Sequence, residues 1–236
     1  MNKDSLLYAV VAQATYINKI DDKNFVMTAK FENKGTDTQG LFGVSNKNTF
    51  VVAFRGSEET GIADWITDLK FIPAVYPYGD PKDKSMTVHS GFMNAYKSVR
   101  DAVQNAVKST PHKQVAFVGH SLGGAIATLA ALDTAYNVPG KSISCYTYGS
   151  PKVGNDSFVK NYNRLVPNTY RCINGHDMVP SAPPGVFGHV GQAYCVGGGS
   201  EKEYSWTEIV ASMMDKIDDH FPYNYIKGLQ AFVKNL

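Results

Sequence analysis

The chain contains 236 residues, of which 43% are hydrophobic and 12% aromatic, enough to bury a core without metals or disulfides and too many for a disordered chain. It has 23 Lys and Arg residues against 21 Asp and Glu residues, and no run of basic residues stands out. The resulting net charge of +2 excludes the basic footprint expected for nucleic-acid binding or for a polybasic membrane patch.

The first part of the chain predicts one helix and one pair of strands. Within Met1–Lys19 apolar residues recur at helical spacing, which indicates an amphipathic helix. The residues on its apolar face are Leu6, Leu7, Val10, Val11, Ala14 and Ile17. Gly40–Ser45 and Thr49–Arg55 have the composition of strands, and the short polar turn between them predicts that they pair.

After this pair, predicted helices and strands alternate. In chain order they are a helix at Gly91–Lys108, a strand at Gln114–Val118, a helix at Gly123–Tyr136, a strand at Ser142–Tyr148, a helix from Asp156, strands at Tyr170–Ile173 and Gln192–Val196, and helices at Trp206–Met214 and Tyr223–Asn235. This order is typical of an α/β protein with a mostly parallel central sheet and helices on both faces. No linker divides the chain, so we expect one domain over residues 1–236. Its functional residues should lie at the carboxyl ends of the strands.

The stretch Val115–Leu132 carries no formal charge and is long enough to cross a bilayer. Its centre holds a histidine, a serine and three glycines, so no transmembrane segment is expected. The sequence Gly119–Gly123 reads Gly-His-Ser-Leu-Gly and lies between a predicted strand and a predicted helix. A turn this sharp needs glycines beside Ser121 and exposes its hydroxyl at the helix N-terminus. Ser121 is therefore the candidate nucleophile; the alternative is an inert serine in a glycine-rich turn.

A serine nucleophile needs a histidine to take its proton and an acid to orient that histidine. Among the aspartates that follow Ser121, Asp177 comes directly after the predicted strand Tyr170–Ile173, in a loop at its carboxyl end. Asp156 is the second candidate for the acid. Asp133 lies deep in the predicted helix after the serine, which is the wrong element for this role. The spacing therefore favours Asp177 as the acid.

Two of the six histidines remain as candidates for the base. His120 and His176 adjoin the other candidates, and their side chains should point elsewhere. His189 would share the loop of the acid, whereas His220 follows a further strand and can approach the serine from the opposite side. Topology favours His220 and leaves His189 as its competitor.

Taken in chain order, these motifs resemble the class 3 (fungal-type) lipase family of the α/β-hydrolase fold, which includes related feruloyl esterases. The matching segments are Phe54–Ser57, Asp64–Leu69, His89–Phe92, Gly119–Gly123, Tyr148–Asn155, Asp177–Pro180, Pro183-Pro184, Gly188–Gly191 and His220–Tyr223. The resemblance implies Ser121 as the nucleophile, Asp177 as the acid and His220 as the general base. It also implies an oxyanion hole formed by the backbone N–H groups of Ser57 and Leu122.

A short amphipathic helix is predicted directly after Ser57. Ile62, Trp65, Ile66 and Leu69 fall at positions i, i+3, i+4 and i+7. The periodicity alone favours an ordinary surface helix that packs on the core. The resemblance instead implies a movable lid over about residues 58–70, with these four side chains as the apolar face that meets lipid.

These features predict a serine carboxylic ester hydrolase similar to triacylglycerol lipases, with an acyl-enzyme on Ser121. Its expected partner is an acylglycerol or other ester at a lipid–water interface. Within the enzymes the alternative is a feruloyl esterase or a phospholipase A1-type esterase. The alternative outside the enzymes is a catalytically silent lipid-binding protein on the same scaffold. We expect a monomer.

Two further residue groups bear on cofactors and compartment. Asp215, Asp218, Asp219 and His220 could suggest a metal cluster, but a solvated helix end is commoner, so neither a metal nor a cofactor is expected.

The family is largely secreted, which implies secretion here. No signal peptide is visible in this chain, and a cytoplasmic location stays open. The three cysteines have no zinc spacing and favour buried free thiols at Cys145, Cys172 and Cys195.

Overall fold

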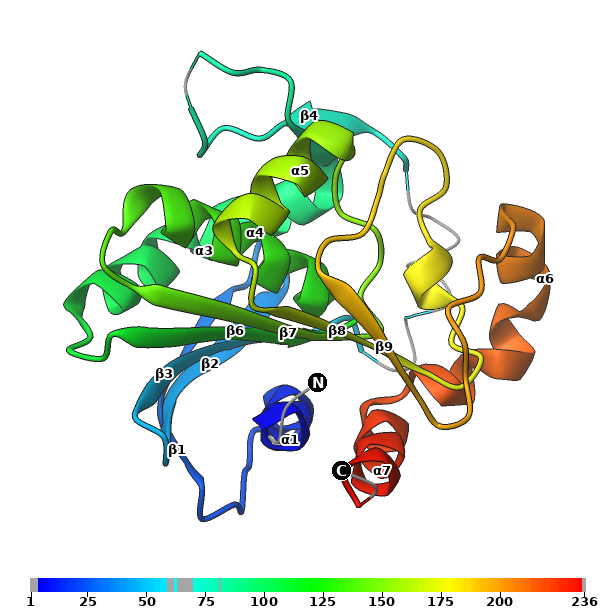
Figure 1. The fold of residues 1–236 in the computed structure, drawn as a ribbon, viewed down its shortest axis with the longest axis horizontal. Helices are drawn as coiled ribbons and strands as arrows, with labels where there is room; N and C mark the ends of the chain where they lie inside the picture. The colour runs from blue at the N-terminus through cyan, green and yellow to red at the C-terminus, as the bar shows by residue number, and fades with distance from the viewer. Residues whose placement is uncertain (1–3, 59–61, 63–69, 81, 235–236) are drawn as a thin grey trace.

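The computed structural model describes residues 4–58, 62, 70–80 and 82–234, without the side chains of 212–216, and is built around a seven-stranded sheet (Figure 1). In spatial order its strands are β1 (Phe25–Asn33), β2 (Thr38–Ser45), β3 (Thr49–Phe54), β6 (Gln114–His120), β7 (Ser142–Tyr148), β8 (Thr169–Asn174) and β9 (Gln192–Val196). The pairs β1–β2 and β2–β3 are antiparallel, and all pairs from β3 to β9 are parallel. The predicted mostly parallel sheet is confirmed.

Helices cover both faces of this sheet, as predicted (Figure 1). One face carries α3 (Ser90–Ser109), α4 (Leu122–Asn137) and α5 (Asp156–Leu165), and the other carries α1 (Asp4–Ile17) and α7 (Pro222–Val233). The remaining elements are the hairpin β4 (Pro73–Val75) and β5 (Thr87–His89), the helix α6 (Trp206–Lys216), and the 3-10 helices η2 (Val179–Ser181) and η3 (Ile217–His220). None of the described helices is long and apolar enough to cross a membrane.

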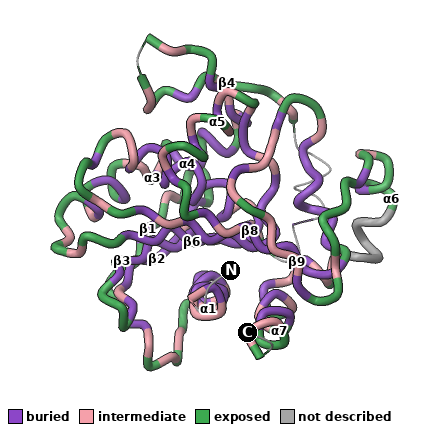
Figure 2. The backbone as a smooth tube through the Cα atoms, in the orientation of Figure 1, coloured by how far each residue is buried: buried purple, intermediate pink, exposed green. Residues whose placement is uncertain are grey.

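Alternate residues of the central strands enter two separate hydrophobic cores. In β6, Val115 and Phe117 pack towards α3 and α4, whereas Ala116 and Val118 pack towards α1 and α7. These central strands are buried along most of their length (Figure 2). The uncharged stretch Val115–Leu132 is therefore apolar because its strand is covered on both faces and its helix packs between the sheet and α3.

The structure corrects two predictions about elements. The first helix buries Tyr8 and Ala12 and leaves Ile17 63% exposed, because the Tyr8 ring packs on Tyr146 of β7, with 4.6 Å between ring centroids. The structure also contains β1, an edge strand that was not predicted. Most of its residues are exposed or only partly buried, so it lacks the alternation that identifies a half-buried strand.

Candidate active site

Ser121 lies in the turn between β6 and α4, in the predicted strand–turn–helix setting. Its backbone has φ 57° and ψ −131°, a combination that costs a residue with a side chain about 1–3 kcal/mol. A Cβ at Gly119 would lie 2.1 Å from the carbonyl oxygen of Gly123, and one at Gly123 would lie 2.3 Å from that of Phe54. Both glycines are therefore needed for the close approach of strand and helix that holds the serine in this strained turn.

Asp177 follows β8, and its side chain is completely shielded from solvent. One carboxylate oxygen, Oδ2, accepts a hydrogen bond from His220 Nδ1 at 2.7 Å and another from the Tyr225 hydroxyl. The other oxygen, Oδ1, accepts from the Val179 N–H at 2.9 Å. Burial, and then the charge of Asp177, raise the pKa of Tyr225 well above its usual range, so this phenol keeps its proton and remains a donor.

His220 ends η3 and is buried beside the carboxyl end of β7. Ser121 N–H donates to the Tyr148 carbonyl at 2.9 Å, and a Cβ on the next residue, Gly149, would lie 2.8 Å from His220 Nδ1. Ser121 and His220 therefore flank the same strand end. Since Nδ1 donates to Asp177, neutral His220 has an unprotonated Nε2. Both Nε2 and the Ser121 hydroxyl are buried, which corrects the exposed hydroxyl predicted for Ser121. Within the described part of the chain, neither atom has a hydrogen-bond partner.

The competing residues lie in other settings. His189 Nε2 bonds the Pro180 carbonyl at 2.7 Å, and burial, reinforced by Arg171, lowers the pKa of His189 to about 3. Asp133 accepts hydrogen bonds from Arg100 and Tyr96 between α3 and α4. The second candidate for the acid, Asp156, is exposed in the first turn of α5.

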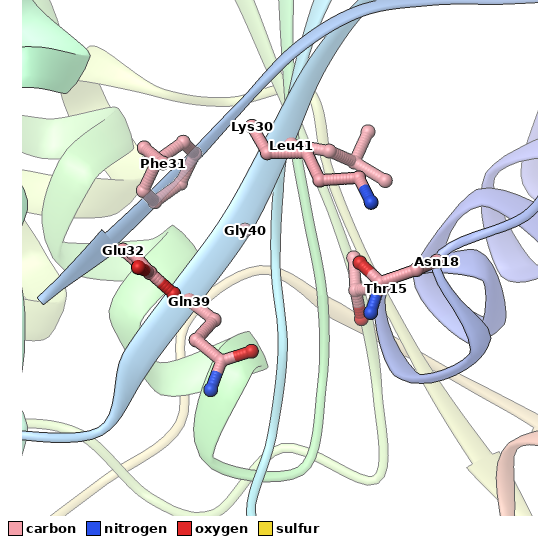
Figure 3. Close-up of a pocket in the computed structure, with 8 residues that line it drawn as sticks. All are labelled: Thr15, Asn18, Lys30, Phe31, Glu32, Gln39, Gly40 and Leu41. Atoms are coloured by element: carbon pink, nitrogen blue, oxygen red, sulfur yellow. The ribbon is translucent and has the colours of Figure 1, made fainter. Parts of the chain in front are cut away.

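The two proposed oxyanion residues line one cavity. Ser57 and Leu122 border a hollow of about 520 Å³ together with Gly56, His89 and Phe92. Leu122 is the first residue of α4, where the free backbone N–H groups and the helix dipole favour negative charge. This cavity is distinct from a hollow of about 390 Å³ between the end of α1 and the strands β1 and β2 (Figure 3).

Only one of the four predicted lid residues is described. Ile62 is fully buried in a small apolar cluster made up of Ile62, Met178, Val179, Ala182, Tyr204 and Ile209. Trp65, Ile66 and Leu69 lie outside the described residues, as does most of the predicted lid at 58–70. Ile62 therefore packs on the segment that directly follows Asp177.

Asp219 of the acidic cluster bonds the backbone beside Asp177, and none of the three cysteines is in a disulfide. Asp219 accepts a hydrogen bond from the His176 N–H at 2.7 Å, and the described residues contain no group of three or more His, Cys, Asp or Glu that could hold a metal. The three cysteines are free. Cys145 and Cys172 are buried as predicted, and Cys195 is half-buried.

Three residues at this site were missed or set aside in the sequence analysis. Tyr225 carries a recognisable signal, since a Tyr on the helix directly after the candidate base can reach the same acid. His120 was set aside because its neighbour is the nucleophile, yet its ring contacts both Tyr16 and His220. For Tyr16 the sequence holds no signal, because 104 positions separate it from His120.

The sequence of this chain is similar to those of known lipases. Residues 51–187 match the family described as lipase (class 3), a segment that includes Ser121 and Asp177 but neither α1 nor His220. The chain is 40% identical over 164 residues to a lipase of Rhizomucor miehei, covering 65% of this chain and 43% of that protein. It is 37% identical over 171 residues to secreted mono- and diacylglycerol lipase 1 of Fusarium solani, covering 69% and 49%. The chain thus spans about half the length of these curated relatives.

Solved structures show the same architecture. A triacylglycerol lipase from Penicillium expansum superposes with a TM-score of 0.73 at 26% identity, covering 84% of this chain and 80% of that one. Lipase II from Rhizopus niveus gives a TM-score of 0.73 at 27% identity, covering 92% of both chains.

Proposed function

Because the chain belongs to the class 3 lipase family, we propose that it is a serine carboxylic ester hydrolase acting on acylglycerols. The observation that carries the proposal is the 2.7 Å hydrogen bond from His220 to the buried Asp177 carboxylate, beside a serine in a strained strand-to-helix turn. An acid that orients a base next to a serine hydroxyl is the arrangement that acyl transfer requires.

In the proposed reaction, His220 Nε2 takes the proton of Ser121 as the serine oxygen attacks the ester carbonyl. The N–H groups of Leu122 and Ser57 receive the oxyanion of the tetrahedral intermediate. His220 then gives its proton to the leaving alcohol, which leaves an acyl-enzyme on Ser121. Water, deprotonated by the same histidine, then attacks the acyl carbon, and the histidine returns the proton to the Ser121 oxygen as the carboxylic acid leaves. Asp177, held by Tyr225 and Val179, stabilises the imidazolium in both steps.

Two observations support acylglycerols as substrates. The relatives named above are lipases, among them a mono- and diacylglycerol lipase and a triacylglycerol lipase. The cavity beside Ser57 and Leu122 includes apolar side chains that suit an acyl chain. We further propose that residues 58–70 form the lid, that residues 1–236 form one domain and work as a monomer, and that the protein is secreted like its named relatives.

The test is a pair of measurements on Ser121→Ala and the unchanged protein. Ester turnover should fall about 10⁴-fold or more, because the nucleophile is lost while the oxyanion hole remains. A fluorophosphonate probe should label the unchanged protein at Ser121 and leave the variant unlabelled. Circular dichroism controls for folding. A variant that keeps most of its activity would exclude Ser121 as the nucleophile.

A substrate panel tests the acylglycerol assignment separately. It contains acylglycerols of increasing chain length, a feruloyl ester and a phospholipid, assayed under the same conditions. We expect the highest kcat/KM on an acylglycerol. Faster hydrolysis of the feruloyl ester or the phospholipid would keep the ester hydrolase and replace the substrate class.

A further inference from the structure

His120 links the N-terminal helix to the loop of the candidate base. Its ring is fully buried, with Nε2 2.5 Å from the backbone carbonyl oxygen of His220 and Nδ1 2.8 Å from the Tyr16 hydroxyl. A carbonyl oxygen only accepts hydrogen bonds, so Nε2 carries the hydrogen and Nδ1 accepts from the Tyr16 hydroxyl. Both bonds therefore require the same neutral tautomer of His120.

Tyr16 is itself fixed where α1 meets the sheet. The Arg55 guanidinium lies 5.7 Å from the centre of the Tyr16 ring, and Arg55 Nη1 donates to Gln39 Oε1 at 2.8 Å. Gln39 extends from β2 opposite the end of α1, where Thr15 and Asn18 lie (Figure 3). The Tyr16 hydroxyl thus has a defined position relative to β2 and β3.

Tyr16 and His120 also lie against Gly56, in the proposed oxyanion segment. A Cβ at Gly56, the residue before Ser57, would lie 2.3 Å from the Tyr16 hydroxyl and 2.7 Å from the His120 carbonyl oxygen. Tyr16 and His120 therefore contact the segment that carries one proposed oxyanion donor, as well as the backbone of the base.

We propose that His120, held by Tyr16, is a positioning residue that fixes the backbone of His220 so that its imidazole Nε2 faces Ser121. The inference rests on the proposed function. His220 ends a 3-10 helix of four residues, and its ring has one hydrogen bond, to Asp177, among the described residues. The ring direction therefore depends on where the His220 backbone is held. A displacement of about 1 Å at a reacting group can slow a reaction about 100-fold.

The charge state of His120 agrees with this role. Burial, and then the nearby His220, lower the pKa of His120 well below its usual range, so the ring stays neutral. The two imidazole rings lie only 4.6 Å apart between centroids. A neutral ring there leaves the positive charge that forms on His220 during turnover without a like-charged neighbour.

Two substitutions of His120 separate positioning from packing. His120→Phe keeps a ring of similar volume and removes both hydrogen bonds. His120→Gln loses the ring, but its amide nitrogen reaches about as far as Nε2 and can donate to the His220 carbonyl. Positioning predicts that kcat falls about 100-fold in the Phe variant with KM nearly unchanged. The Gln variant should stay at least tenfold above it. A packing role predicts the opposite order.

Tyr16→Phe provides a milder test with a matched control. It deletes the hydroxyl that orients the His120 ring, and we expect kcat to fall about tenfold without a change in KM. Tyr194→Phe removes a hydroxyl from a surface contact with Gln192 and should leave kcat unchanged. If His120→Phe does not fold, as thermal unfolding will show, Tyr16→Phe and His120→Gln decide between the two roles. An unchanged kcat in Tyr16→Phe would then overturn the inference.

The labelling rate of Ser121 by a fluorophosphonate distinguishes failure of this inference from failure of the proposed function. If the unchanged protein neither hydrolyses esters nor reacts with the probe, the proposed function is wrong. If the unchanged protein does both and His120→Phe reacts equally fast, only the positioning role is wrong. The expected result is slower labelling of His120→Phe and of Tyr16→Phe, in the same order as their kcat values.

Discussion

His189 and His220 differ in what surrounds each ring, and this difference predicts their separate roles. His220 bonds the buried Asp177, while His189 bonds the Pro180 carbonyl. We expect His220→Ala to lower kcat about 10⁴-fold or more with the fold retained. His189→Gln, which can still donate to Pro180, should keep kcat within about fivefold. Steady-state kinetics on the same ester decides the assignment, and a larger loss in the His189 variant would reverse it.

At the scale of single residues, the sequence could identify those whose roles follow from local patterns. Ser121 lies in a motif with fixed spacing, and Asp177 comes directly after a strand, so both positions could be predicted. The contacts between Tyr16 and His120 could not, because they depend on how α1 packs against the sheet. A residue's distance to another element is set by tertiary packing, which no local pattern contains.

At the scale of the elements, Asp133 of α4 links this helix to α3, and its loss should destabilise the fold. Asp133 is fully buried and accepts hydrogen bonds from Arg100 Nε at 2.6 Å and from Asn137 Nδ2 at 2.7 Å. Asp133→Ala should lower the free energy of unfolding by about 3 kcal/mol, since it removes the carboxylate that accepts from Arg100 and from the buried Tyr96 hydroxyl. Asp101→Ala, which removes a carboxylate that is 94% exposed, should change it by less than about 0.5 kcal/mol. Urea unfolding of both variants measures the difference, and equal effects would contradict the explanation.

The proposed lid makes a second prediction for an element. If residues 58–70 open on lipid, hydrolysis should rise sharply once a sparingly soluble ester exceeds its solubility limit. The rate is measured across that limit, with a fully soluble short-chain ester as the control. A smooth hyperbolic curve for both esters would leave these residues as an ordinary surface helix.

The elements that could be predicted have strong local signals. Ser142–Tyr148 and Gln192–Val196 agree with β7 and β9 to the residue, because apolar and aromatic residues predominate in each run and glycines bound it. The short strands β4 and β5 have three residues each and only exist through pairing with each other. Their position is a consequence of tertiary structure, so the sequence contained no periodicity for them.

For the whole molecule, three buried histidines predict how stability depends on pH. Burial is the main cause of a lowered pKa at His89, His120 and His189, the last to about 3. Below about pH 6.5 the unfolded chain binds protons that the folded chain does not, so the stabilisation present above that pH is lost as the pH falls towards these lowered values. Each fully titrating histidine contributes about 1.4 kcal/mol per pH unit.

Urea unfolding at pH 7 and pH 5 tests this prediction. Stability should be lower at pH 5, and His189→Gln should reduce the difference by up to about 1.4 kcal/mol per pH unit. Because the cause is burial, the difference should change little between low and high salt. Equal stability of the unchanged protein at both pH values would contradict the prediction.

The packing of α1 against α7 also sets an order of events during synthesis. Both helices lie on the same face of the sheet (Figure 1), and each contributes a tyrosine to the surroundings of the base. On the ribosome α1 emerges before the strands on which it packs, whereas α7, which packs beside it, emerges after all of them. His220 and Tyr225 emerge after every strand of that sheet. Under the proposed mechanism, a nascent chain therefore presents its serine long before it has any means of activating it.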